Sequence, residues 1–301
     1  MSGRDLGASV RQRLLNQSRA QNRPFQELLQ YFAMERFLYR LAKSPHSDRF
    51  ILKGALLLTA WRAPVSRPTM DIDLAARTNN QLDHIQEVVS AVCGVAVNPD
   101  GIEFNRDSIE VARIKEDAHY EGVRVQFHGT LARARIPMQL DIGFGDVITP
   151  GPTEVEYPTI LDFPAPVLRA YPKESVVAEK LEALTALGLL NSRMKDYYDL
   201  ALLSRMYMFE GERLADAIIA TFRNRRTTIE AEPMGLTKAY CDDPPRVIQW
   251  RAFVRRSRFG EEAFGLTRIV DEIRPFLLPV LSKIATDNPF TSQWKPGGPW
   301  E

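Results

Sequence analysis

The residues best suited to chemistry in this chain are two carboxylates one residue apart, Asp71 and Asp73, separated by apolar Ile72. Residues i and i+2 of a β-strand share a face, so the two carboxylates are expected to project together while Ile72 points into the core. Two such carboxylates repel each other unless a cation lies between them, and oxygen ligands of this kind suit Mg²⁺. A D-x-D pair is also common on surface strands and turns, so the pattern alone leaves a solvated strand open.

A third carboxylate, Asp141, alternates with Leu140 and Ile142 and so lies on the polar face of a strand of core quality. On a strand beside the first pair, Asp141 would complete a two-metal site that clamps the attacking and leaving oxygens of phosphoryl transfer. It could instead accept the proton of an attacking hydroxyl. An edge-of-sheet aspartate is equally compatible with the spacing, because Gly143 and Gly145 follow closely.

A helix predicted over 173–190 places Lys180 inside its apolar arc. A buried ammonium is costly without a partner, so its head should reach anionic groups, and a nucleoside triphosphate tail would serve. The alternative is a lysine whose stem snorkels past the helix edge. Asp196 and Asp199 raise the same question, since they share a packing stripe with Leu200. Their expected cation is Lys180, Arg193 or a metal, although acidic residues near a helix N-terminus also favour its dipole.

Composition describes an ordinary globular protein of 301 residues, 45% hydrophobic and 26% charged, with room for two domains. No apolar run approaches the roughly 18 residues of a membrane span, and the first residues lack the apolar core of a secretory signal. The two cysteines, Cys93 and Cys241, lie far apart, which fits a reducing cytosol. We therefore expect a cytoplasmic protein without a membrane partner.

Histidine and charge narrow the chemistry further. The four histidines form no zinc pattern, so any metal should be held by oxygen. The net charge of +1 gives no overall attraction to nucleic acid. The arginine-dense segments 223–226 and 251–258 are either a local nucleic-acid footprint or solvated helical faces.

Periodicity and turn residues predict an α/β front half and a helical back half. The expected elements are helices over 9–43 broken at 22–24, a strand over 50–52, a turn at 53–54, a helix over 55–61, the D-x-D strand, a helix over 81–93, strands within 95–149, a proline-rich connector over 150–172, and helices thereafter, interrupted near 188–191 and 231–246. The tail from 289 onward, which contains Pro-Gly-Gly-Pro, is expected to be poorly ordered.

Several motifs occur in an order that resembles the AbiEii toxin family of the polymerase-β-like nucleotidyltransferase superfamily. The first is Lys53-Gly54-Ala55 followed by Arg67-x-Thr69-x-Asp71-x-Asp73-Leu74. The others are Gln139-Leu140-Asp141-Ile142-Gly143-Phe144-Gly145-Asp146, Glu179-Lys180-Leu181 and Lys195-Asp196-x-x-Asp199-Leu200, with family-like segments at 35–41 and 249–253. The resemblance covers nearly the whole chain, and the ordered set is more specific than any single motif.

This resemblance implies an α+β fold of two lobes. The first, over 1–160, would combine N-terminal helices with a nucleotidyltransferase mixed sheet and its flanking helices. The second, over 170–301, would be a mostly helical domain that completes the nucleotide site.

The resemblance also implies an activity: a Mg²⁺-dependent nucleotidyltransferase, with a two-metal site and a nucleoside triphosphate as substrate. It would be the toxin of a bacterial toxin–antitoxin or phage-defence pair, with a cognate antitoxin encoded nearby. Its relatives, similar to the MenT-type tRNA nucleotidyltransferase toxins, transfer nucleotides to the 3′ acceptor end of tRNA and block translation.

The implied roles fall on positions that match the family motifs. Asp71, Asp73 and Asp141 would hold metal and, with Lys180 and Asp199, form the catalytic set. The implied nucleotide-binding residues are Lys53, Gly54, Ala55, Arg67, Thr69, Lys180, Lys195 and Asp196. One departure is Ala55, where the superfamily turn usually has glycine or serine. Ala55 lacks a hydroxyl for phosphate, so backbone amides or Arg67 must do more of that binding.

Two other functions remain open at this point. The same chemistry could use a protein or small-molecule hydroxyl as acceptor. The fold could instead be a catalytically silent module that binds nucleotide, RNA or an antitoxin, although the presence of all three acidic positions and Lys180 argues against silence.

Overall fold

The computed structural model describes residues 3–63, 68–117, 120–257 and 265–301. The chain divides into two compact units. The first comprises Met1–Asp146 and Thr153–Tyr171, and the second comprises Val147–Pro152 and Pro172–Glu301. The fold class is α+β, as the sequence predicts, with a mixed sheet and flanking helices in the first unit and a helical C-terminal region.

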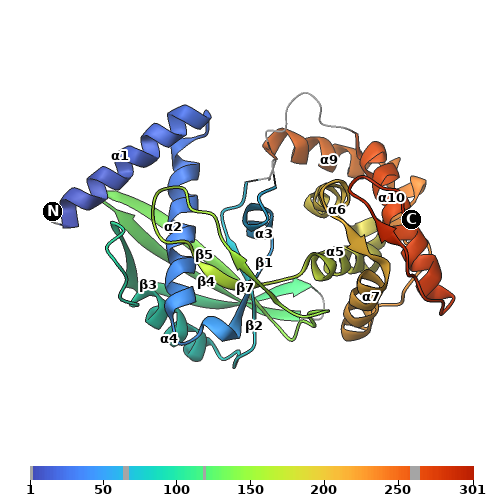
Figure 1. Cartoon of the computed structure of the whole chain (residues 1–301), viewed down its shortest axis with the longest axis horizontal. Helices are drawn as coiled ribbons and strands as arrows, with labels where there is room; N and C mark the ends of the chain where they lie inside the picture. Colours follow the sequence, from blue (N-terminus) through green and yellow to red (C-terminus); the bar gives the residue numbers. More distant parts are fainter. Residues whose placement is uncertain (1–2, 64–67, 118–119, 258–264) are drawn as a thin grey trace. The chain divides into compact units, whose positions relative to one another are not determined.

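The first unit is built on a seven-stranded sheet with the strand order β3-β4-β5-β2-β1-β7-β6 (Figure 1). β2 runs parallel to β5 and β1 runs parallel to β7, whereas the other neighbours are antiparallel. The two parallel pairs therefore join strands that are far apart in sequence, which brings motifs from distant segments to one place. The strand bounds are β1 Phe50–Lys53, β2 Ile72–Ala76, β3 Ile102–Asp117, β4 Tyr120–Leu131, β5 Ala134–Phe144, β6 Thr153–Glu156 and β7 Val167–Ala170.

Helices cover one face of this sheet. α2 (Phe25–Lys43) contacts β5 and also α4 (Leu82–Cys93), which packs against β3, while α1 (Gly3–Gln21) packs on α2. The short α3 (Leu56–Ala60) follows β1. On β4, Phe127 meets Phe37 of α2 with ring centroids 5.6 Å apart. Because side chains alternate along a strand, the residues next to Phe127 point away from α2.

The proline-rich segment 150–172 is not a plain connector, contrary to the sequence prediction. It contains β6 and β7, and Tyr171 N–H donates to the Leu52 carbonyl at 3.0 Å to join it to β1. Four-residue strands between prolines carry too little alternation to be recognised locally, so pairing with the rest of the sheet decides them.

Buried charges of α2 hold the same segment against the helix. Glu35 accepts a hydrogen bond from Ile160 N–H at 2.7 Å, and Arg36 donates to the Pro164 carbonyl at 2.9 Å. Both side chains are almost completely buried, and they also pair with each other at 2.8 Å. Burial raises the pKa of Glu35 to about 7, against the lowering effect of Arg36.

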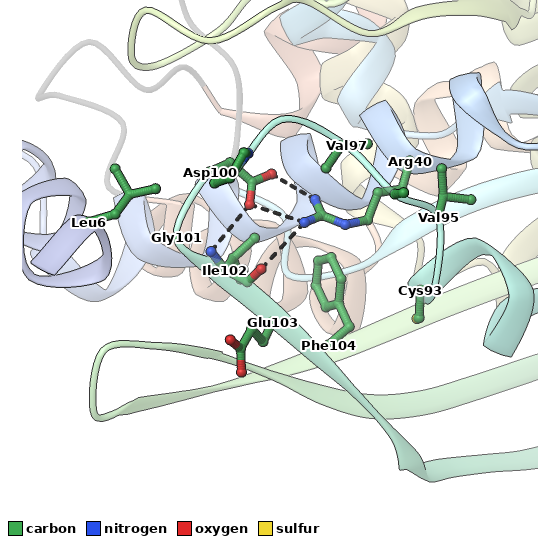
Figure 2. Close-up of a pocket in the computed structure, with 12 residues that line it drawn as sticks. Leu6, Arg40, Cys93, Val95, Val97, Asp100, Gly101, Ile102, Glu103 and Phe104 are labelled. Carbon is green, nitrogen blue, oxygen red and sulfur yellow. Dashed lines mark hydrogen bonds and ion pairs between the residues drawn. The ribbon is translucent and has the colours of Figure 1, made fainter. Parts of the chain in front are cut away.

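A second buried ion pair ties α2 to the segment that enters β3. Figure 2 shows the Arg40 guanidinium bonded to both Asp100 oxygens, at 2.7 and 3.0 Å, and to the Ile102 carbonyl at 3.3 Å. The same view shows Cys93 on the wall of this pocket. Both charges of the pair are satisfied internally, so the pair anchors α2 to this segment.

The second unit is mostly helical. Its elements are α5 Lys173–Leu187, α6 Met194–Met206, α7 Gly211–Arg225, α8 Lys238–Cys241, α9 Pro244–Ser257, α10 Leu266–Ala285 and the strand pair β8 Phe209–Glu210 with β9 Gln293–Trp294. Among the described residues, no helix combines the length and apolarity that crossing a bilayer requires.

The C-terminal tail is packed, contrary to the expected disorder. Trp294 is 3% exposed, its ring lies 5.0 Å from that of Phe276, and its Nε1–H donates to the Ser204 carbonyl at 2.7 Å. Trp300 stacks on the same Phe276. The Pro-Gly-Gly-Pro composition suggested flexibility, but buried Trp294 and half-buried Trp300 anchor the segment on either side of it.

Candidate active site

Four charged residues form a row across adjacent strands of the sheet. Lys53 of β1 is the partner of Asp73 on β2, Asp73 is the partner of Asp141 on β5, and Asp141 is the partner of Arg124 on β4. Partners directly opposite each other point to the same face. Arg124 lies three residues before Phe127 on β4, so this row faces away from α2.

The acidic part of this row, joined by Asp71, is a compact cluster of three carboxylates, the acidic triad. One oxygen each from Asp71, Asp73 and Asp141 lies within 4.8 Å of the other two. Asp71 lies just before β2, and the hydroxyl of buried Thr69 donates to its Oδ1. Thr69 is itself fixed, because its backbone N–H donates to the Tyr31 hydroxyl at 3.1 Å. A set of hard oxygen donors at this separation fits a divalent cation such as Mg²⁺.

Gly54, which follows β1, allows the backbone to approach the triad. Its φ is +73°, in the left-handed region that favours glycine. A Cβ added at this position would lie 1.8 Å from Asp73 Oδ2 and 2.6 Å from Asp73 Cβ. Only glycine therefore fits between β1 and the Asp73 carboxylate, and the next residue, Ala55, is buried at the start of α3.

Arg124 is a member of the site that sequence reasoning missed. Its Nε donates to Asp141 Oδ1 at 2.8 Å and its Nη2 donates to Oδ2 at 2.7 Å. The hydrogen bonds to Asp141, and the negative charges of Asp71 and Asp73 beyond it, raise the pKa of Arg124. Its place in the alternating run Val-Arg-Val marked the polar face, but the strand register that puts it opposite Asp141 is a tertiary property.

Of the other residues predicted to bind nucleotide in the first unit, Lys53 is described by the structure and Arg67 is not. Lys53 is buried, and its Nζ donates to Asp146 Oδ2 at 2.9 Å. Asp146 was part of the recognised motif but had no expected role. Arg67 lies outside the described residues.

A second charged cluster occurs in the helical unit. Lys180 Nζ of α5 lies 2.7 Å from Asp196 Oδ1 and 2.7 Å from Asp199 Oδ2, both on α6. Arg193 Nε lies 2.7 Å from Asp196 Oδ2. Burial alone would raise the pKa of Asp196, but the charges of Lys180 and Arg193 outweigh it and hold that pKa well below its usual range. Lys195, in contrast, is exposed.

Two of the cations expected beside Asp196 and Asp199 lie in this cluster. Lys180 contacts both carboxylates, and Arg193 contacts Asp196. Lys180 can therefore lie within the apolar arc of α5 because two carboxylates of α6 neutralise its charge. Its side chain is only 14% exposed. The fourth member, Arg193, precedes α6.

The two arginine-dense segments differ in accessibility. Arg225 is bound internally, because its Nη1 lies 2.9 Å from Glu182 Oε2 and its side chain is 10% exposed. On α9, Arg251, Arg255 and Arg256 are exposed. Arg258 lies outside the described residues. The footprint expected over 223–226 is thus partly structural, whereas that on α9 faces solvent.

The first unit thus combines a mixed sheet and flanking helices with converging carboxylates beside a left-handed glycine, the arrangement expected of a nucleotidyltransferase. The family model for the nucleotidyl transferase AbiEii toxin of type IV toxin–antitoxin systems matches residues 36–274. The chain therefore belongs to the AbiEii family of nucleotidyltransferase toxins.

Two solved structures resemble the chain at low sequence identity. A crystal structure of a candidate nucleotidyltransferase from H. pylori is 17% identical and covers 88% of this chain and 99% of its own, with a TM-score of 0.48. The crystal structure of JHP933 from Helicobacter pylori is also 17% identical in sequence. The match covers 87% of this chain and 94% of JHP933, with a TM-score of 0.49. No curated protein matches the chain significantly.

Proposed function

We propose that this toxin catalyses Mg²⁺-dependent transfer of a nucleoside monophosphate from a nucleoside triphosphate to the 3′ hydroxyl of tRNA, which blocks translation. The observation that carries the proposal is the acidic triad, three carboxylates with oxygens within 4.8 Å of one another on neighbouring strands. The family membership supports the nucleotidyl-transfer chemistry and an antitoxin partner.

In this proposal Asp71 and Asp73 hold the cation, with Asp141 as the third acid. When bound, Mg²⁺ would neutralise phosphate charge and orient the α-phosphate for in-line attack by the acceptor hydroxyl, with pyrophosphate as the leaving group. Thr69 fixes the orientation of Asp71 through its hydroxyl. The absence of a side chain at Gly54 lets phosphate approach the backbone amides that follow β1.

Within the helical unit, the residues proposed to act on the nucleotide are Lys180, Lys195, Asp196 and Asp199. Its buried cluster of Lys180 with two carboxylates is pre-organised by 2.7 Å contacts. A fixed array of this kind supports positioning and charge stabilisation, the main contributions to phosphoryl-transfer catalysis. Lys195, next to Asp196 in the sequence, is exposed to solvent. Its ammonium group is therefore free of burial and suited to binding a phosphate.

The exposed arginines of α9 are the proposed contacts to the tRNA backbone. Arg251, Arg255 and Arg256 are arranged along one helix, and arginine binds phosphate through two parallel hydrogen bonds. Replacing all three with glutamine should weaken tRNA binding and flatten its salt dependence while nucleotide binding is unchanged.

The direct test incubates the protein with Mg²⁺, total tRNA and each of the four α-labelled nucleoside triphosphates. We expect label on tRNA, no label on periodate-oxidised tRNA that lacks a 3′ hydroxyl, and loss of label with Asp71→Ala. Asp83→Ala, an exposed carboxylate on α4, is the matched control and should keep activity. Label that survives Asp71→Ala would refute the assigned site. Label on protein or on a small molecule, with none on RNA, would show a different acceptor, and no label at all would favour a binding module.

A further inference from the structure

Arg124 contacts the acidic triad through Asp141. Its guanidinium binds both oxygens of Asp141, at 2.8 and 2.7 Å. The amide of Gln139 lies on the same carboxylate, with Nε2 at 3.3 Å from Oδ1 and 3.4 Å from Oδ2. A carboxylate accepts about four hydrogen bonds, so these donors occupy the directions through which Asp141 would bind a cation.

The net charge of the triad and Arg124 also limits how many cations the site can bind without a nucleotide. Three carboxylates carry −3 and Arg124 carries +1, which leaves −2 on the cluster. One divalent ion neutralises that charge, whereas a second must be accompanied by further negative charge. The triphosphate of a nucleotide is the reactant that brings such charge.

Arg124 is placed to exchange one anion for another. Its side chain is 39% exposed, whereas that of Asp141 is 12% exposed, so the guanidinium lies on the solvent side of the pair. A guanidinium binds phosphate with the same two-pronged geometry that it uses for carboxylate. The exchange therefore keeps its hydrogen bonds while it releases Asp141.

We propose that Arg124 couples nucleotide binding to metal binding, which makes it a positioning residue for the metal site. Without nucleotide it holds Asp141 away from cations, and with nucleotide it binds the phosphates and leaves Asp141 to the metal. This inference rests on the proposed function, because it requires a triphosphate at the triad. It also assigns Asp141 a metal-binding role that depends on the bound nucleotide.

The test measures Mn²⁺ binding by electron paramagnetic resonance, alone and with the α,β-methylene analogue of each nucleoside triphosphate. Wild type, Arg124→Gln and Arg124→Lys are compared, with Arg135→Gln, at an exposed position of β5, as the matched control. Removing a positive charge in contact with the triad should tighten binding of Mn²⁺ alone by about tenfold. The factor by which an analogue tightens Mn²⁺ binding should fall by about tenfold in Arg124→Gln. Arg124→Lys, which keeps charge but not the planar fork, should bind Mn²⁺ alone as wild type does.

Thermal melts of each variant establish that it is folded before binding is compared. If folded Arg124→Gln binds Mn²⁺ no more tightly than wild type and shows the same dependence on the analogue, the pair is only a structural salt bridge and the inference is wrong. If no analogue changes Mn²⁺ affinity in wild type, the coupling is refuted as well. The tRNA-labelling assay then decides separately whether the proposed function stands, because wild-type transfer activity does not depend on the outcome for Arg124.

Discussion

Gly54→Ala is the smallest substitution that tests whether the position of Asp73 matters. An added Cβ would lie 1.8 Å from Asp73 Oδ2, and real Cβ contacts are essentially never shorter than 3.0 Å, so the carboxylate must move by about 1.2 Å. A misplacement of about 1 Å in a catalytic array can reduce the rate by roughly 10²-fold. We therefore expect nucleotidyl transfer by Gly54→Ala to fall by about two orders of magnitude.

The same substitution should also lower the free energy of unfolding. Alanine in the left-handed region costs about 1–2 kcal/mol, and overpacking adds about 1–3 kcal/mol. Gly297 separates the two effects, because its φ of +83° is similar but a Cβ there meets nothing within 4 Å. Gly297→Ala should lose only the backbone contribution and keep its activity.

The assay combines urea denaturation with single-turnover transfer of labelled nucleotide at saturating Mg²⁺. Single-turnover conditions isolate the chemical step from product release. Wild-type activity in Gly54→Ala would refute the reasoning, because the collision with Asp73 would then have no catalytic consequence. Equal loss of activity in Gly54→Ala and Gly297→Ala would instead assign the effect to backbone strain alone.

Three further substitutions test the buried charges and the tail. Glu35 has its pKa raised from 4.5 to about 7, so its stabilising contribution is complete below pH 4.5 and is lost as the pH rises through 7. At about 1.4 kcal/mol per pKa unit, the stability of wild type relative to Glu35→Gln should fall by roughly 3 kcal/mol between pH 4.5 and pH 8, and urea melts that show a pH-independent difference would contradict this. Lys180→Met leaves two buried carboxylates without their shared cation and should destabilise by about 3–5 kcal/mol, whereas exposed Lys195→Met should be nearly neutral in the same denaturation assay. Trp294→Ala should destabilise by about 3–5 kcal/mol, and a thermal melt unchanged from wild type would show that the tail is not anchored by this ring.

Local sequence determined the helices and the five strands β1 to β5. The break between α1 and α2 is readable because Pro24 lacks a backbone N–H, and the strand that carries Asp73 is readable from its alternation. β7 was not readable, because its four residues pair in parallel with β1 from far away in sequence. The tail was misjudged because glycine and proline content reports flexibility of an isolated segment, whereas Trp294 is fixed by distant contacts.

The sequence by itself also determined which side chains have the chemistry: the D-x-D spacing, a third carboxylate on a strand of core quality, and a lysine within an apolar helical arc. These follow from periods of 2 and 3.6 residues, which are local. Only the tertiary structure decided the partners. Strand register placed Arg124 opposite Asp141, and helix packing brought Lys180 to Asp196. Such pairings join residues through long-range hydrogen bonds and burial, for which a single sequence has no periodic signal.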